Sequence, residues 1–151
     1  IQFAGSLTNR RKSRSGKSLE LQVKVLLERQ GVHFNYDSTI EGGKRPDFIF
    51  PSVIKYEDPS TSPLELAMLA VKTTCKDRWR QILNEASRIQ TKHLLTLQEG
   101  VSERQFAEMS ESQVVLVVPE PLHSKYPKSI RSQLLTVEDF VNHIQGLESI
   151  I

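Results

Sequence analysis

The sequence predicts an α/β fold, with a central mixed β-sheet flanked by helices on both faces. Apolar segments short enough to be strands alternate with segments of helical periodicity through the second half of the chain. Glycine, proline or polar residues bound most of the strand segments, as turns do. At 151 residues, with 38% hydrophobic and 25% charged residues, the chain has the size and composition of one globular domain.

One helix and three strands are expected in the first half of the chain. Leu19, Val23 and Leu26 recur at helical spacing, and Gly31 follows them as a helix stop. The segment 65–73 is almost continuously apolar, which is typical of a strand buried on both faces. In chain order, the expected elements are a helix at 18–30, a short strand at 34–36, a turn at 41–44, a strand at 47–50, a loop at 58–63 and a strand at 65–73.

Two strands and three helices are expected in the second half. A helix is predicted over 76–89, because one stripe of that segment is apolar and its flank carries polar residues that include Arg78 and Glu85. Thr136 followed by Asp139 is typical of a helix cap. The expected elements are the helix at 76–89, a strand at 93–97, a helix at 102–109, a buried strand at 113–118, and a final helix from Thr136 to about Gly146.

Composition excludes several protein classes. The longest aliphatic run, Val114–Val118, is too short to cross a bilayer, and the first residues lack the pattern of a secretory signal, so we expect a cytoplasmic protein. The single cysteine, Cys75, precludes an intramolecular disulfide and a multi-cysteine zinc site, and the four histidines show no ligand spacing. Because the chain starts without methionine, we expect one domain over residues 1–151 that is a fragment of a longer protein.

Basic charge is concentrated in two places. The first 17 residues hold no acid and five basic residues, so the remaining chain carries −3 of a total net charge of +2; the five are Arg10, Arg11, Lys12, Arg14 and Lys17. The second cluster surrounds Asp77 and consists of Lys72, Lys76, Arg78 and Arg80. Two such clusters fit a polyanion held against one face. A solvated, merely solubilising arm remains the alternative for the first cluster.

Three residues have the chemistry of a magnesium-dependent nuclease centre. Asp47 opens one strand, Lys72 ends another, and Glu85 follows on the predicted helix. Carboxylate-bound magnesium can activate water and neutralise charge on a phosphate. Asp47 and Glu85 would be metal ligands together with the backbone carbonyl of Val71. Lys72 would position or deprotonate the attacking water, or stabilise the charged transition state. Proline-aspartate pairs such as Pro46-Asp47 are also common turn openers, so this pattern alone is only moderately specific.

The segments Gly16–Glu20, Arg45–Phe48 and Val71–Gln81, with Glu85, resemble the catalytic C-terminal domain of the EcoRII family of restriction endonucleases. The resemblance covers essentially the whole chain. It implies the PD-(D/E)XK nuclease fold, magnesium dependence, a homodimer, and type II cleavage of double-stranded DNA at CCWGG-like sites. It also implies a bacterial restriction-modification system and an upstream effector DNA-binding domain in the full-length protein.

The sequence departs from the common pattern of that superfamily at one position. An acid usually stands two residues before the lysine, but here that residue is Ala70. Enzymes of the EcoRII type depart in the same way and take the second acid from the following helix. The resemblance therefore implies that Glu85 fills this role.

Further site residues carry over from the resemblance. Lys76, Asp77 and Arg78 match the segment that reads base pairs, and their chemistry agrees, because cations suit guanine O6 and N7 and a carboxylate suits cytosine N4. An exposed helix start with an internal ion pair is the alternative. Glu20 would bind a second metal or orient Lys72, or is a solvated carboxylate. Tyr56 matches a tyrosine proposed near the active site of this family. We expect it to pack or to contact a phosphate rather than to act covalently, because a metal-dependent hydrolase needs no covalent intermediate.

Two other classes of protein remain possible from the sequence. A repair or junction nuclease on the same fold would cut by DNA shape, without needing CCWGG. A non-catalytic DNA-binding module would not need Asp47, Lys72 and Glu85 together.

Overall fold

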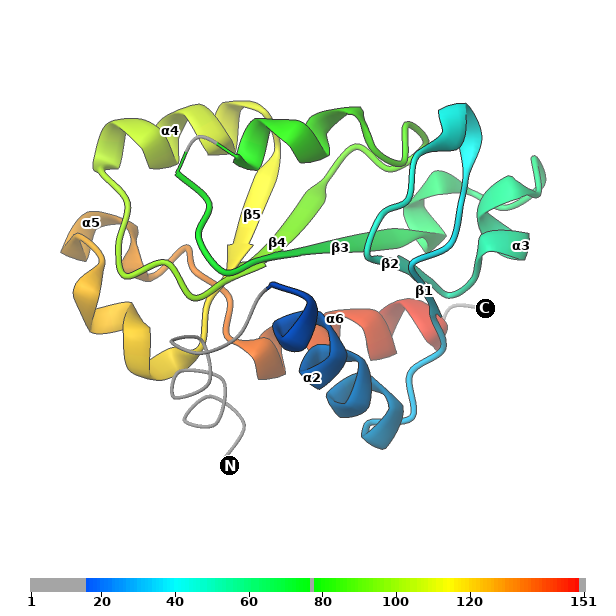
Figure 1. Ribbon diagram of the computed structural model, residues 1–151, viewed down its shortest axis with the longest axis horizontal. Coiled ribbons are helices and arrows are strands. Elements are labelled where there is room, and N and C mark those ends of the chain that lie inside the picture. Colours follow the sequence, from blue (N-terminus) through cyan, green and yellow to red (C-terminus); the bar gives the residue numbers. More distant parts are fainter. Residues whose placement is uncertain (1–15, 77, 150–151) are drawn as a thin grey trace.

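A computed structural model describes residues 16–76 and 78–149 of the chain. Its centre is a sheet of five strands, which lie side by side in their chain order (Figure 1). The strands are β1 (Asn35–Tyr36), β2 (Phe48–Phe50), β3 (Ala67–Lys72), β4 (Lys92–Thr96) and β5 (Val114–Val117). β1, β2 and β3 pair antiparallel, whereas β3, β4 and β5 pair parallel, so the predicted mixed sheet is confirmed.

Helices cover both faces of this sheet, as predicted. In Figure 1, α2 (Gly16–Arg29) and α6 (Val137–Glu148) lie on one side, and α4 (Glu103–Glu111) lies on the other beside the 3-10 helix η3 (Trp79–Asn84). Short helices complete the chain: η1 (Glu41–Gly43), α3 (Val53–Glu57), η2 (Pro63–Glu65), η4 (Glu120–Lys125) and α5 (Lys128–Arg131). No helix in the described part of the chain is both long and apolar enough to cross a membrane.

The register of the sheet decides which side chains share a face. Ile49 pairs with Met68, and Ala70 pairs with Leu94. Because residues opposite one another in a sheet point to the same side, this register places Ala70, Lys72 and Lys92 on the face covered by η3. The opposite face carries Phe50 and His93, whose rings contact Phe140 of α6 at centroid distances of 5.5 and 5.0 Å.

The final helix begins where its cap was predicted. The Thr136 side chain accepts a hydrogen bond from the Asp139 N–H, and the Asp139 side chain accepts one from the Thr136 N–H, both at 2.9 Å. Such a capping box satisfies two helix donors that would otherwise lack partners. Ser102 caps α4 in a similar way by accepting from the Gln105 N–H.

The predicted helix over 76–89 is wrong. Only Trp79–Asn84 is helical, as a 3-10 helix; Glu85 is extended, and Ala86 has a φ of 53°. The apolar stripe is nevertheless buried, with Trp79 1% and Ile82 0% exposed. A 3-10 helix also brings apolar residues to one face every three positions, so burial alone did not distinguish the two helix types. The helices α3 and α5 were not predicted, because one turn is too short to show a periodicity.

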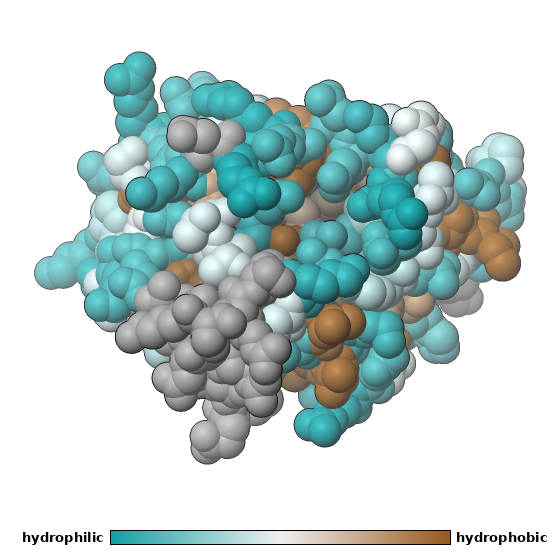
Figure 2. Space-filling model, in the orientation of Figure 1, coloured by the Kyte–Doolittle hydropathy of each residue, from teal (hydrophilic) through white to brown (hydrophobic). Residues whose placement is uncertain are grey.

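The surface in Figure 2 is mostly hydrophilic, with apolar atoms over α2 and near α3. The exposed large hydrophobic side chains of the described residues are Leu21, Val25, Ile54 and Leu64. Ile54 and Leu64 are the most exposed of these, at 81% and 85%.

Candidate active site

Asp47 is fixed at the entrance to β2 by two backbone contacts. Its Oδ2 accepts a hydrogen bond of 2.7 Å from the N–H of Val71 in β3. Its carbonyl accepts one of 2.9 Å from the N–H of Asp37. The carboxylate is therefore tied to the strand that ends at Lys72, one residue beyond Val71. The predicted pairing of Asp47 with the end of this strand is a direct contact in the fold.

Glu85 lies close enough to Asp47 and Lys72 for their charges to act on its carboxyl group. It directly follows η3 and its backbone is extended. One carboxylate oxygen, Oε1, is buried and has no hydrogen-bond partner among the described residues. Buried carboxylate oxygens normally have a partner, so an unpaired one points to a ligand that the protein chain does not itself supply.

The two carboxyl groups and Lys72 interact electrostatically. Burial raises the pKa of Glu85 to about 7, with a further increase from the negative charge of Asp47, while Lys72, Lys92 and Lys44 oppose the shift. Burial likewise raises the pKa of Asp47 to about 6, against the Val71 N–H bond and Lys72, which lower it. Two strongly shifted acids beside one lysine are typical of a functional site.

The donor set at this site fits a magnesium ion. Asp47 and Glu85 supply carboxylate oxygens, which Mg²⁺ prefers. The Val71 carbonyl would be a third donor, because in an extended strand the N–H and the carbonyl of one residue face the same neighbouring strand, and the Val71 N–H contacts Asp47. Among the described residues, no group of three or more His, Cys, Asp or Glu side chains has metal-binding spacing. Two carboxylates with water completing the shell are the usual arrangement for Mg²⁺.

Glu20 lies near Asp47, but its carboxylate contacts Tyr36 and Lys17. Its Oε1 accepts a hydrogen bond of 2.9 Å from the Tyr36 hydroxyl and lies 3.9 Å from the Lys17 ammonium. Its negative charge raises the pKa of Asp47, so it acts on the site from the side of α2. The three carboxylates of Glu20, Asp47 and Glu85 do not form one metal-binding group in the described part of the chain.

Tyr56 is buried in α3, and its hydroxyl is fully used. It donates to Glu41 Oε2 at 3.0 Å and accepts from the Arg88 N–H at 3.2 Å. Glu41 also accepts from the Ser87 N–H at 3.0 Å. These contacts favour the packing role: Tyr56 and Glu41 hold the two residues 87 and 88, which follow shortly after Glu85.

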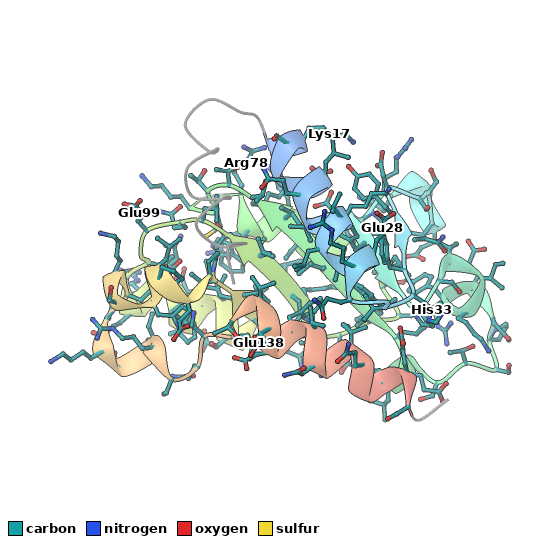
Figure 3. The ribbon with its side chains drawn as sticks, turned by 90° about the horizontal axis from the view of Figure 1, so that it is seen from below. Lys17, Glu28, His33, Arg78, Glu99 and Glu138 are labelled. Carbon is teal, nitrogen blue, oxygen red and sulfur yellow. The ribbon has the colours of Figure 1, made fainter. Side chains whose placement is uncertain are left out.

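The segment expected to read bases is held by two glutamines. Gln98 Oε1 accepts from the Cys75 N–H at 3.2 Å, and Gln105 Nε2 of α4 donates to the Lys76 carbonyl at 2.6 Å. The Lys76 and Arg78 side chains are exposed, and in Figure 3 Arg78 and Lys17 lie toward the same edge of the molecule. Asp77 and the arm residues Arg10, Arg11, Lys12 and Arg14 fall outside the described residues.

Two lysines near Glu85 were not recognised from the sequence. Lys44 and Lys92 both counteract the rise in the pKa of Glu85, so their charges lie close to its carboxyl group. Lys92 opens the buried strand β4, which also contains the polar residues His93 and Thr96, and a lysine in a buried strand was the signal that could have identified it. Lys44 is next to Arg45 in front of the Pro46-Asp47 pair, as part of a short basic run.

Comparison with known families and relatives agrees with this geometry. The family model described as EcoRII C terminal matches residues 1–141. The chain is 55% identical over 148 residues to the type II restriction enzyme EcoRII of Escherichia coli, covering 97% of this chain and 37% of that protein. It is 29% identical over 156 residues to the type II restriction enzyme SsoII of Shigella sonnei, covering 96% of this chain and 50% of that protein. The chain thus spans half or less of the length of these relatives.

Solved structures with a similar fold include two restriction-enzyme complexes. Metal-depleted Ecl18kI in complex with uncleaved DNA superposes with a TM-score of 0.77 and 29% identity, covering 97% of this chain and 50% of that one. The complex of the restriction endonuclease PspGI with substrate DNA gives a TM-score of 0.71 at 19% identity, covering 97% of this chain and 66% of that one, which supports the fold alone.

Proposed function

The chain belongs to the EcoRII C-terminal family, and from this membership we propose that it is the catalytic domain of a type II restriction endonuclease. Its reaction is the Mg²⁺-dependent hydrolysis of phosphodiester bonds in double-stranded DNA at CCWGG-like sites. The observation that carries the proposal is the cluster of Asp47, Lys72 and Glu85, in which a buried carboxylate oxygen of Glu85 has no hydrogen-bond partner within residues 16–76 and 78–149.

Each residue of the cluster has a role that follows from its position. Asp47 and Glu85 would hold the metal, with the Val71 carbonyl as a further donor. A bound divalent metal supplies charge neutralisation at the phosphate and lowers the pKa of a coordinated water. The Lys72 ammonium, at the end of β3, stabilises negative charge on the phosphate or orients the attacking water. Glu20 acts on this centre through its charge, or as a ligand of a second metal.

Recognition falls to the segment that follows β3. The exposed cationic side chains of Lys76 and Arg78 suit guanine edges in the major groove, and Asp77 suits the cytosine amino group. The basic arm with Arg10, Arg11, Lys12, Arg14 and Lys17 would contact phosphates without regard to sequence.

We further propose the assembly and setting that such an enzyme requires. Cleavage of both strands at a nearly symmetric site calls for two copies of this domain related by a two-fold axis, and hence a homodimer. The E. coli relative is much longer than this chain, so an additional DNA-binding domain would precede this one, and residues 1–151 would form the catalytic unit. The setting would be the bacterial cytoplasm.

Plasmid cleavage tests the proposed function. The purified protein is incubated with Mg²⁺ and two plasmids that differ only in the presence of CCWGG sites, with EDTA and the Lys72→Ala variant as controls. Linear product from the CCWGG plasmid alone, absent in both controls, is the expected result. Equal cutting of both plasmids would favour a repair or junction nuclease, and binding without cutting would favour a non-catalytic module.

A further inference from the structure

Lys92 is a buried lysine whose ammonium contacts only backbone carbonyls in the hydrogen bonds of the described residues. It is 5% exposed and opens β4 on the face covered by η3. Its Nζ donates to the carbonyls of Glu85 at 2.6 Å, Ala86 at 2.8 Å and Ile89 at 2.5 Å. All three hydrogens of the ammonium therefore have a partner, and all three partners lie in the turn that begins with Glu85.

Burial of a lysine at this position costs free energy unless hydrogen bonds to its ammonium compensate for the lost hydration. Leu94 and Leu95 in the same strand are apolar and buried, and an apolar residue would avoid the cost of removing an ammonium from water. Burial accordingly lowers the pKa of Lys92, while the charges of Glu85 and Glu41 oppose this. The Lys92 Nζ supplies donors to three carbonyls of the turn, which would lose them if an apolar side chain stood at this position.

The turn that Lys92 holds needs support. The backbone changes from η3 to an extended Glu85, and then to Ala86 with a φ of 53°, a conformation that residues with a side chain rarely adopt. On its far side the same turn is held by Glu41, which accepts from the Ser87 N–H, and by Tyr56, which accepts from the Arg88 N–H. Glu85 thus enters the site from a backbone fixed on both sides.

We propose that Lys92 is a positioning residue that holds Glu85 in place for metal binding, acting through the Glu85 backbone. This inference rests on the proposed function, because it takes Glu85 as a metal ligand. The hydrogen bonds of the Lys92 Nζ to the carbonyls of the turn are the basis for a positioning role rather than a role as a ligand. Partners behind metal ligands typically change metal affinity 10- to 100-fold when they are removed.

The test is Mg²⁺ binding by the Lys92→Met variant, measured by calorimetry with a phosphorothioate CCWGG duplex bound so that cleavage does not interfere. Methionine keeps most of the side-chain volume and removes the ammonium. The expected result is a Mg²⁺ affinity about 10- to 100-fold weaker than in the natural protein. Affinity for the duplex without metal should change less than threefold, and cleavage should recover in large part at saturating Mg²⁺. Unchanged Mg²⁺ affinity in a folded Lys92→Met protein would overturn the inference.

A matched control separates positioning from general instability. Leu94→Ala removes a buried side chain from the same face of the same strand and leaves the three carbonyl contacts intact. If Leu94→Ala weakens Mg²⁺ binding as much as Lys92→Met does, at equal loss of thermal stability, Lys92 has only a structural role. If the natural protein neither binds Mg²⁺ nor cleaves, the proposed function fails instead.

A second measurement needs no variant. Hydrogen exchange of the amides at 85–89 is compared in the natural protein with and without Mg²⁺. If Lys92 preorganises the turn, these amides are protected before metal is added, and Mg²⁺ changes their rates less than about threefold. Rapid exchange that becomes slow only with Mg²⁺ would mean that the metal, rather than Lys92, orders the turn, and would also overturn the inference.

Discussion

The carboxyl groups of Asp47 and Glu85 bind protons more tightly than carboxyl groups in water do. Both pKa values lie above their ordinary range, at about 6 and about 7, chiefly because burial separates the carboxylates from water. Metal binding needs the deprotonated forms. Metal binding at these two carboxyl groups therefore competes with protonation, more strongly than it would at carboxyl groups exposed to water.

This linkage predicts how the metal-free protein responds to pH. An acid whose pKa is raised on folding binds more protons in the folded than in the unfolded state between the two pKa values, so stability falls as pH rises through that window. For Glu85 the window runs from 4.5 to about 7, and the loss amounts to about 3 kcal/mol at most. Urea unfolding in EDTA between pH 4 and pH 8 should show this decline. The Glu85→Gln variant should give a flatter curve, and parallel curves would contradict the assignment.

The carboxylate of Asp47 allows a substitution that preserves its structural contact. In Asp47→Asn, the amide oxygen can still accept the Val71 N–H bond, while the negative charge is lost. Cleavage should fall below detection, whereas DNA affinity should stay the same or increase, because a charge that repels phosphate is gone. Plasmid cleavage with Mg²⁺ and gel-shift titration without it measure the two effects. Retained cutting would remove Asp47 from the metal site.

At the scale of elements, the connection between β3 and η3 joins the residues proposed for base recognition to the lysine proposed for catalysis. Lys72 ends β3, the Cys75 and Lys76 backbone is fixed by Gln98 and Gln105, and Arg78 stands at the N-cap of η3. α4, which provides Gln105, also holds η3 through an Arg80–Glu108 ion pair of 3.1 Å. The segment proposed to read bases is therefore attached to Gln98 and, through α4, to a second element.

Arg78→Ala should relax specificity at one base pair. Loss of a base-edge contact costs about 1 to 3 kcal/mol and weakens discrimination at the position that it reads. Competition titrations against single-base variants of CCWGG measure this loss, with Gln133→Ala, an exposed residue of the segment after α5, as a control. A uniform loss of affinity for all duplexes would show that Arg78 contacts phosphate instead.

The elements that the sequence predicted well are those with local signals. The capping residues Thr136 and Asp139 located the start of α6, and the apolar run ending at Lys72 located β3. The predicted helix over 76–89 failed, because its end is determined by Lys92, whose ammonium binds carbonyls of the turn and belongs to the next strand. Such a contact depends on the tertiary fold.

The charged residues of the candidate site could be predicted from the sequence, but the residues that hold the backbone around them could not. Asp47 and Lys72 were proposed from residue type and spacing, and the role of Glu85 rested also on the family resemblance; the fold brings the charges of all three together. The residues that hold the site were missed, because Gln98, Gln105 and Lys92 act through backbone groups. A side chain that binds backbone leaves no motif in the sequence.

At the scale of the whole molecule, charge is divided between the arm and the remainder. Residues 1–17 carry five basic residues, and the rest of the chain is mildly acidic. General attraction to DNA should therefore depend strongly on the arm, while sequence selection depends on the segment after β3.

Replacing Arg10 and Arg11 with glutamine should weaken binding to all duplexes alike. Each lost phosphate contact lowers the steepness of the salt dependence by about 0.9 in a plot of log affinity against log salt concentration. Titrations at several salt concentrations, with cognate and mismatched duplexes, measure both effects. A change in the ratio between cognate and mismatched binding would assign these arginines to base reading instead.

The short connection from Lys72 to Arg78 also limits the distance between these two residues. Five residues lie between them, and the six residue steps from Lys72 to Arg78 reach about 20 Å in a fully extended chain. At about 3.4 Å per base pair, this distance corresponds to about six base pairs along DNA. The backbone of one copy can therefore place this segment only within about that distance of the phosphate it cuts. A family member with a longer target would have to lengthen this connection or read the additional bases with another part of the protein.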